Sequence, residues 1–125
     1  MRFFAMLGAL SAAIAVGAGA FGAHALRARL EPRMLDVFET GARYQMYHAL
    51  GLFAVAWILG QGGRGAGMAS ASGWLFVAGT LLFSGSLYAM ALSGVRALGA
   101  ITPLGGVCFI AGWVLLAVSA ARLPR

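Results

Sequence analysis

The chain has 125 residues, of which 62% are hydrophobic and only 10% are charged, and its net charge of +6 comes entirely from arginine on the basic side. A soluble domain carries about 25% charged residues. A single domain of this length cannot hide so much apolar surface in its own interior. The excess has to face lipid, so the composition excludes an ordinary soluble protein.

The arginines stand singly at the edges of apolar runs instead of clustering on one face. That placement is typical of membrane proteins, whereas a nucleic-acid-binding domain gathers its basic residues into a patch. We therefore expect membrane lipids as surroundings and no nucleic acid as a partner. The lone cysteine, Cys108, lies inside an apolar run and is interpreted as a small buried hydrophobe.

Residues 3–23 form an uncharged apolar run that is long enough to cross a bilayer, which takes about 20 helical residues. Arg2 before this run and Ala23-His24-Ala25 after it also fit a secretory signal peptide. The apolar region of a signal peptide has only about 7–15 residues, so we favour a retained helix. Small residues that allow close helix packing recur along the run at spacings of three or four: Gly8, Ala12, Ala15, Gly19 and Ala23.

The stretch over residues 24–48 is the one polar island of the chain and holds all three acidic residues. Pro32 suits the first turn of a helix, and apolar residues recur after it at helical spacing. We expect a short amphipathic helix over about residues 32–43 that lies at the membrane surface. Glu39 precedes Arg43 by four residues, which is the favourable order for a helical ion pair.

Three more apolar runs predict membrane spans over about residues 44–60, 73–93 and 103–121. Gly94 is the expected stop of the third span. Gly85 and Ala89 add a second pair of small packing residues at helical spacing.

Together these elements predict one membrane domain over residues 1–125. It is all-α, an integral membrane four-helix bundle with a short amphipathic interfacial helix between its first and second spans. Four spans place both termini on the same side of the membrane. The arginines divide almost evenly between the two sides. Pairing between arginines and acids in the polar island would leave the terminal side more positive, which favours cytoplasmic termini.

The side chains best suited to chemistry are His24, Tyr44, Gln45 and His48, at the two ends of the polar island. Both histidines are expected near the same membrane face. If they converge, they could bind a metal or haem or relay protons. If they do not, both are interfacial hydrogen-bonding groups. No motif with the spacing of a zinc site is present, so no metal and no cofactor is expected.

No nucleophile motif is recognisable, and no acid or base is expected in the middle of a span, where ion-coupled carriers need one. We therefore expect a protein that is not an enzyme, with a structural or accessory role. A small oligomeric transporter or channel component is one alternative, and a redox or metal-binding protein that uses the histidines is another. The expected partners are lipids and either a second copy or another membrane protein.

Several short blocks carry a resemblance to a known family. They are GAFGAHAL at residues 19–26, TGARYQMYHAL at 40–50, LFSGSLY at 82–88, ITPLGG at 101–106 and AGW at 111–113. In these blocks the chain resembles the bacterial YgdD-like inner-membrane proteins, the family called domain of unknown function 423, which is related to eukaryotic transmembrane protein 256.

The resemblance falls in all four expected spans, in order. It implies a small four-helix protein of the bacterial inner membrane with a retained first helix and cytoplasmic termini. It implies no established biochemical activity. It also suggests that His24, Tyr44, Gln45 and His48 belong to the pattern of the family, while the charged residues 27–39 do not.

Overall fold

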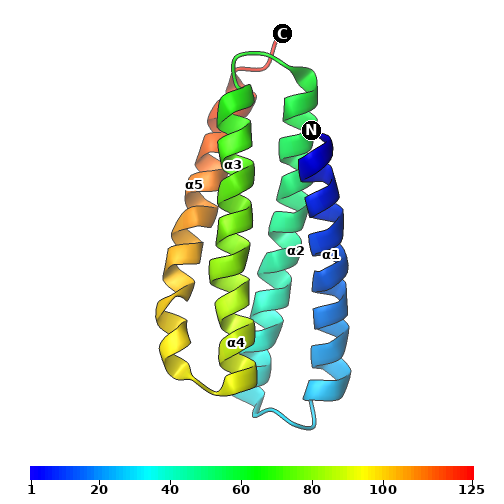
Figure 1. Cartoon of the computed structure of the whole chain (residues 1–125), viewed down its shortest axis with the longest axis vertical. Coiled ribbons are helices and arrows are strands. Elements are labelled where there is room, and N and C mark those ends of the chain that lie inside the picture. Colours follow the sequence, from blue (N-terminus) through cyan, green and yellow to red (C-terminus); the bar gives the residue numbers. More distant parts are fainter.

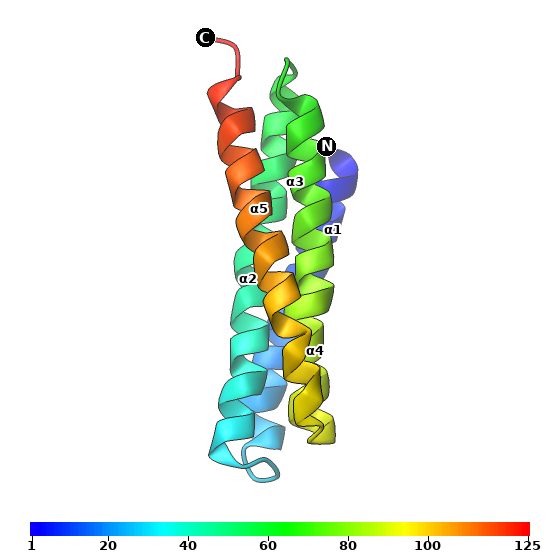
Figure 2. The same ribbon diagram turned by 90° about the vertical axis from the view of Figure 1, so that its left-hand side faces the viewer.

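The structure, a computed structural model of residues 1–125, consists of four long helices packed side by side along one axis (Figure 1). Both termini lie at the same end of this bundle. Figure 2 shows that α3, η2 and α4 follow one another as a single rod. The elements in chain order are α1 (Arg2–Phe21), the π-helical η1 (Gly22–Leu26), α2 (Pro32–Gln61), α3 (Ala66–Gly79), the π-helical η2 (Thr80–Ser84), α4 (Gly85–Ser93), the 3-10 helix η3 (Arg96–Ala100) and α5 (Thr102–Ala121).

The polar island and the second expected span form one helix, α2, which has 30 residues and no break. Pro32 occupies its first turn, as the sequence predicts. Gly41 is the only residue near the expected junction that could interrupt a helix, and here it is a packing position. A Cβ at Gly41 would come within 2.9 Å of the Tyr88 ring. The amphipathic helix expected over residues 32–43 is therefore not a separate element but the first three turns of α2.

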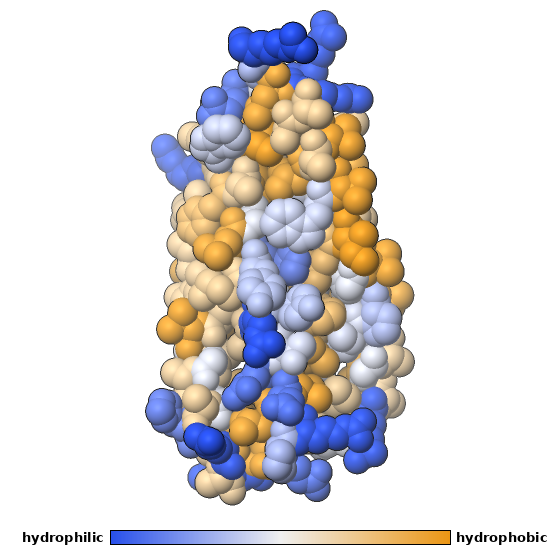
Figure 3. Space-filling view, turned by 180° about the vertical axis from the view of Figure 1, so that it is seen from behind, coloured by the Kyte–Doolittle hydropathy of each residue, from blue (hydrophilic) through white to orange (hydrophobic).

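The bundle is longer than the apolar part of a membrane. At 1.5 Å per residue, the 30 residues of α2 extend about 45 Å, whereas the hydrocarbon layer is about 30 Å thick. Three helical rods are long and apolar enough to span a membrane, namely Arg2–Leu26, Ala66–Ser93 and Arg96–Ala121. On the face that carries α2, hydrophilic side chains gather at both ends of the bundle, and a more polar strip runs between them (Figure 3).

Aromatic rings build much of the core by filling space that glycines leave on neighbouring helices. Phe76 lies against both Gly51 of α2 and Gly112 of α5, where a Cβ would come within 2.9 Å and 2.7 Å of its ring. Phe76 itself is completely buried. Further ring and glycine pairs are Phe4 with Gly73, Phe38 with Gly22, Tyr88 with Gly41 and Phe109 with Gly79, whereas Gly105 lies against the backbone of Phe83.

The small residues expected to pack helices behave differently from one another. A Cβ at Gly8 would come within 2.9 Å of the Ala49 carbonyl oxygen, so Gly8 sets the approach of α1 to α2. Ala12 is half-buried. Gly19 has no heavy atom within 4 Å of an added Cβ, Gly85 has only the Thr80 carbonyl oxygen at 4.0 Å, and Ala89 is exposed. Spacing shows which small residues share a face, but not whether that face meets another helix.

Candidate functional site

His48 lies near the middle of the bundle and not at its end, because α2 begins twelve residues earlier than the span expected from residue 44. Its side chain is buried. The imidazole is stacked on Phe109 of α5, with ring centroids 3.4 Å apart and planes 6° from parallel. His48 therefore lies in the middle of its helix and not near the start of a span, where the sequence predicts it.

Both ring nitrogens of His48 are engaged. Trp113 Nε1 lies 3.0 Å from His48 Nε2, and His48 Nδ1 lies 2.7 Å from the Tyr44 carbonyl oxygen. An indole N–H can only donate a hydrogen bond. Nε2 must therefore be the acceptor, which puts the proton on Nδ1, where it is donated to Tyr44. His48 is held as one neutral tautomer that ties α2 to α5.

Gln45 is the second buried polar side chain of α2 and joins three helices. Its Nε2 donates to Ser11 Oγ of α1 at 3.2 Å. Its Oε1 accepts from the hydroxyl of Tyr88 in α4 at 2.7 Å. Inside a membrane an unbonded amide is costly, so these bonds explain how a glutamine can occupy the interior of the bundle.

Further hydroxyl groups connect the remaining helices. Ser72 of α3 donates to the Gly112 carbonyl oxygen at 2.7 Å, and Ser119 donates to the Gly65 carbonyl oxygen at 2.7 Å. Ser84 is the exception: its Oγ is buried and has no hydrogen-bond partner. Ser72 and Ser119 are thus hydrogen-bonding groups that connect α3 to α5 and α5 to the loop before α3.

The four side chains expected to form one cluster are divided among three places. Tyr44 and His48 stay together, with near-parallel rings whose centroids are 6.3 Å apart. The Gln45 side chain leaves α2 in another direction, toward Ser11 of α1. His24 is exposed in η1 at the far end of α1.

The two histidines do not converge. Gly22 of η1 packs against Phe38, whereas Gly8 of α1 packs against Ala49, the neighbour of His48. These two levels are about 20 Å apart along α1, at 1.5 Å per residue. The expectation that both histidines lie at the same membrane face is wrong, because α2 carries His48 deep into the bundle.

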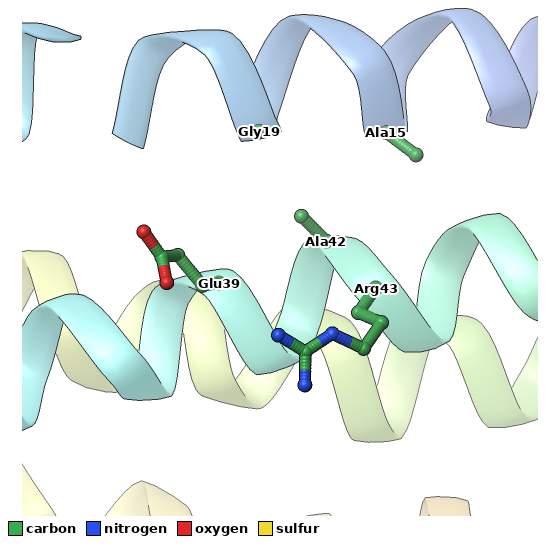
Figure 4. A pocket seen from close by; sticks show the side chains of 5 residues that line it. All are labelled: Ala15, Gly19, Glu39, Ala42 and Arg43. Carbon is green, nitrogen blue, oxygen red and sulfur yellow. The ribbon is translucent and has the colours of Figure 1, made fainter. Parts of the chain in front are cut away.

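A shallow hollow between α1 and α2 is lined by Ala15, Gly19, Glu39, Ala42 and Arg43. The expected ion pair between Glu39 and Arg43 is not formed. The Glu39 side chain points toward α1, whereas the Arg43 side chain extends away from α1 (Figure 4). An exposed ion pair on a helix contributes little free energy, so the competing hydration of the two groups is enough to separate them.

Two further hollows lie at the middle height of the bundle. The one between α2 and α5 has a volume of about 550 Å³, and rings dominate its lining. The one between α1 and α3 has a volume of about 320 Å³ and is lined by Leu7, Leu10, Ser11, Ile14, Gln45, Leu52, Val77, Thr80 and Leu81. Volumes of about 300–1,000 Å³ are typical of small-molecule sites.

The partners of the buried polar side chains, Ser11, Tyr88 and Trp113, come from three other helices. The Tyr88 hydroxyl is recognisable in the sequence as a group that can bond a neighbouring helix, whereas Ser11 and Trp113 are interpreted as ordinary residues of apolar spans. A hydroxyl or indole N–H in a span has to find a partner, but nothing in the spacing along one helix shows which residue of another helix supplies it.

A bundle of long apolar helices, joined internally by hydrogen bonds and with its charged side chains gathered toward its ends, defines a small integral membrane protein. The family model described as "Protein of unknown function (DUF423)" matches residues 18–106. The chain belongs to this family, as the resemblance in its sequence blocks predicts.

Related proteins align with nearly the whole length of this chain. The UPF0382 membrane protein YwdK of Bacillus subtilis is 49% identical over 122 residues, which covers 98% of each chain. A UPF0382 membrane protein of Staphylococcus saprophyticus is 47% identical over 123 residues, covering 98% of this chain and 100% of the relative. One from Staphylococcus epidermidis is 48% identical over 122 residues, covering 98% of each. No solved structure matches.

Proposed function

We propose that the chain is a non-enzymatic accessory protein of the bacterial inner membrane, whose interior polar side chains hold its helices in a fixed arrangement. The observation that carries the proposal is that these side chains bond one another. Gln45 bonds Ser11 and Tyr88, and His48 bonds Trp113. Hydrogen bonds that connect buried side chains of different helices make a structure rigid and specific. They leave no nucleophile beside a free base, which covalent catalysis needs.

The same bonds weigh against the two alternatives. A metal or haem at His48 would have to displace Trp113 from Nε2 or Tyr44 from Nδ1, and His24 lies at another level. A transporter or channel needs a path along the bundle. The three hollows described above each lie at one level between neighbouring helices.

Flux measurements on vesicles test this proposal. The purified chain is reconstituted into liposomes that enclose a pH-sensitive dye, and proton and small-solute permeation are compared with those of protein-free liposomes. We expect no difference. Permeation that appears with the wild-type chain and disappears with a folded Tyr88→Phe variant would replace the proposal with the transporter. A visible absorption band that disappears with His48→Phe would replace it with the redox protein.

Four crossings are part of the proposal, with α2 as the fourth. Its middle residues stand at the level of the three apolar rods, and its first turns, with Glu31, Arg33 and Asp36, extend into the headgroup layer. The N-terminal turns of α2 thus lie at the membrane surface as a straight extension of the part that crosses the membrane. Cysteine accessibility along α2 tests this: a cysteine at Asp36 should react with a membrane-impermeant maleimide, and one at Val55 should not.

The end of the bundle that carries the termini is proposed to be cytoplasmic. Arg2, Arg64, Arg122 and Arg125 belong to this end, and no acidic residue does. The positive-inside rule favours that orientation. A fluorescent protein fused after Arg125 should fold and fluoresce, and a phosphatase fused there should be inactive. The reverse pattern would invert the orientation.

An accessory role requires a partner, either a second copy of the chain or another membrane protein. The outer face of α2 offers a contact surface, because Leu50, Phe53 and Trp57 are exposed large side chains on it. A photo-crosslinking amino acid at position 57, introduced in cells, should give one discrete protein adduct. Adducts with lipid alone would contradict the accessory role.

A further inference from the structure

The hollow between α1 and α3 combines an apolar wall with polar groups from three helices. Ser11 of α1, Gln45 of α2 and Thr80 of η2 line it together with leucine, isoleucine and valine side chains. Gln45 is more than nine-tenths buried, with 5% of its surface exposed. A mostly apolar cavity with a few convergent polar groups is the usual composition of a small-molecule site.

These polar groups have unused hydrogen-bonding capacity. The Gln45 amide nitrogen carries two hydrogens and makes one bond, the 3.2 Å contact to Ser11 Oγ, which is longer than the usual 2.9–3.0 Å for N–H···O bonds. The Thr80 hydroxyl makes no hydrogen bond, whereas the helical Thr40 donates to the Asp36 carbonyl oxygen at 2.8 Å. The second amide hydrogen of Gln45 and the Thr80 hydroxyl can therefore turn toward the hollow, and neither group carries a charge.

Thr80 also marks an irregularity of the backbone. It begins the π-helical turn η2, in which the Gly85 N–H bonds the Thr80 carbonyl oxygen. A π-helical turn inside a long helix is uncommon and occurs frequently at functional sites. Here the irregular turn contributes Thr80 and Leu81 to the lining.

We propose that this hollow binds a neutral, lipid-soluble carbonyl compound of the quinone class, whose carbonyl oxygen accepts hydrogen bonds from Gln45 and Thr80. The free Gln45 amide N–H can only donate and the Thr80 hydroxyl can also donate, so a ligand that engages both groups with one atom has to supply an acceptor. No cationic side chain lines the hollow, and an anion would be too costly to bury there. The rest of the ligand lies against the apolar wall.

The position of the hollow favours a free lipophilic compound over the ester group of a membrane lipid as the source of the carbonyl oxygen. Ser11 is in the middle of α1, and Thr80 is in the middle of the rod Ala66–Ser93. The ester carbonyls of membrane lipids stay at the headgroup boundary, whereas a free lipophile can enter the hydrocarbon layer. The rim residues Leu10, Ile14 and Leu81 are 61%, 60% and 70% exposed, so the hollow opens sideways to lipid.

Thermal stability of the purified chain in dialkyl ether-lipid nanodiscs tests the proposal, with decylubiquinone as the probe. Cys108, the only cysteine, is half-buried, so a thiol-reactive fluorescent dye reports unfolding through a single site. Binding to the folded state raises the melting temperature as the probe concentration increases. We expect a saturable rise with decylubiquinone and none with dodecane, which has the apolar chain without the carbonyl groups.

Substitutions locate the binding. Thr80→Val keeps the shape of the side chain and removes a donor, and we expect it to weaken probe binding by about threefold to tenfold. Leu81→Trp adds bulk at the exposed rim and should block binding even if Thr80→Val does not fold. Tyr47→Phe, in the hollow between α2 and α5, is the matched control and should leave the affinity unchanged.

Every other result contradicts the proposal. No shift with decylubiquinone, or an equal shift with dodecane, means that the carbonyl group is not recognised. A shift that survives both Thr80→Val and Leu81→Trp, or that only Tyr47→Phe reduces, places the ligand elsewhere. A wild-type chain that already melts higher in ester-lipid than in ether-lipid nanodiscs, by an amount that Thr80→Val abolishes, would make a lipid ester the occupant.

Discussion

Trp113 donates a hydrogen bond of 3.0 Å from Nε1 to Nε2 of His48, and this contact between α5 and α2 fixes the protonation of the imidazole. Since Nε2 is the acceptor, the proton is on Nδ1 and is donated to the Tyr44 carbonyl oxygen at 2.7 Å. Nδ1-protonated histidine is the less usual neutral form in water, so its presence would be direct evidence of the contact.

The first prediction concerns this tautomer. Nitrogen-15 NMR of the chain in detergent micelles should show His48 as the neutral form protonated on Nδ1. Trp113→Phe keeps a ring but removes the donor, and should destabilise the bundle by about 1 kcal/mol in SDS unfolding, because a buried acceptor is left without its partner. An Nε2-protonated His48 in the wild-type chain would show that the indole does not donate to it.

The second prediction uses two glycines of α1. Gly8→Leu should destabilise the bundle by about 1–3 kcal/mol, because a side chain there meets the Ala49 carbonyl oxygen and overpacks the contact with α2. Gly19→Leu is the matched control, since nothing lies within 4 Å of an added Cβ, and its melting temperature should stay close to wild type. Equal damage by both substitutions would mean that the face around Gly19 is covered by another chain.

The third prediction concerns the bond between Gln45 and Tyr88, which is 2.7 Å long and joins α2 to α4. A double-mutant cycle with Gln45→Leu and Tyr88→Phe should give a coupling energy of about 0.6 kcal/mol, the usual value for a hydrogen bond between membrane helices. Unfolding in SDS provides the four free energies. Additive effects of the two substitutions would show that the bond contributes nothing to stability.

The number and approximate bounds of the long helices follow from features that are visible in the sequence. Long uncharged runs specify helices that cross a membrane, and Pro32 and Gly94 mark an actual helix start and an actual stop: Pro32 is in the first turn of α2, and Gly94 ends α4 with φ 75°. The boundary expected between the amphipathic helix and the second span does not exist in the structure, because both belong to α2. A change in polarity along a helix does not break it when no residue opposes helical geometry.

The contacts in the interior were less predictable, because the residue pattern of one helix does not show which residues of another helix it will contact. Gly51 and Gly112 accept the same ring, that of Phe76, from opposite sides, although 61 positions of chain separate them in the sequence. Small-residue spacing pointed equally to Gly8, which packs against α2, and to Gly19, which faces open space. His48 appeared terminal because the boundary of its span was set from hydropathy, and a buried, hydrogen-bonded imidazole lowers hydropathy in the same way as an exposed one.

The last prediction concerns Ser84, whose hydroxyl is buried without a hydrogen-bond partner. Ser84→Ala removes an unsatisfied polar group and little volume, so it should stabilise the bundle by up to about 1 kcal/mol. Ser72→Ala is the matched control, because Ser72 is equally buried but donates to the Gly112 carbonyl oxygen at 2.7 Å. It should destabilise the bundle by about 1 kcal/mol. The free energies of unfolding of both variants in SDS test this prediction. A loss of stability in Ser84→Ala would mean that the hydroxyl has a partner in the membrane, such as a bound water or a ligand.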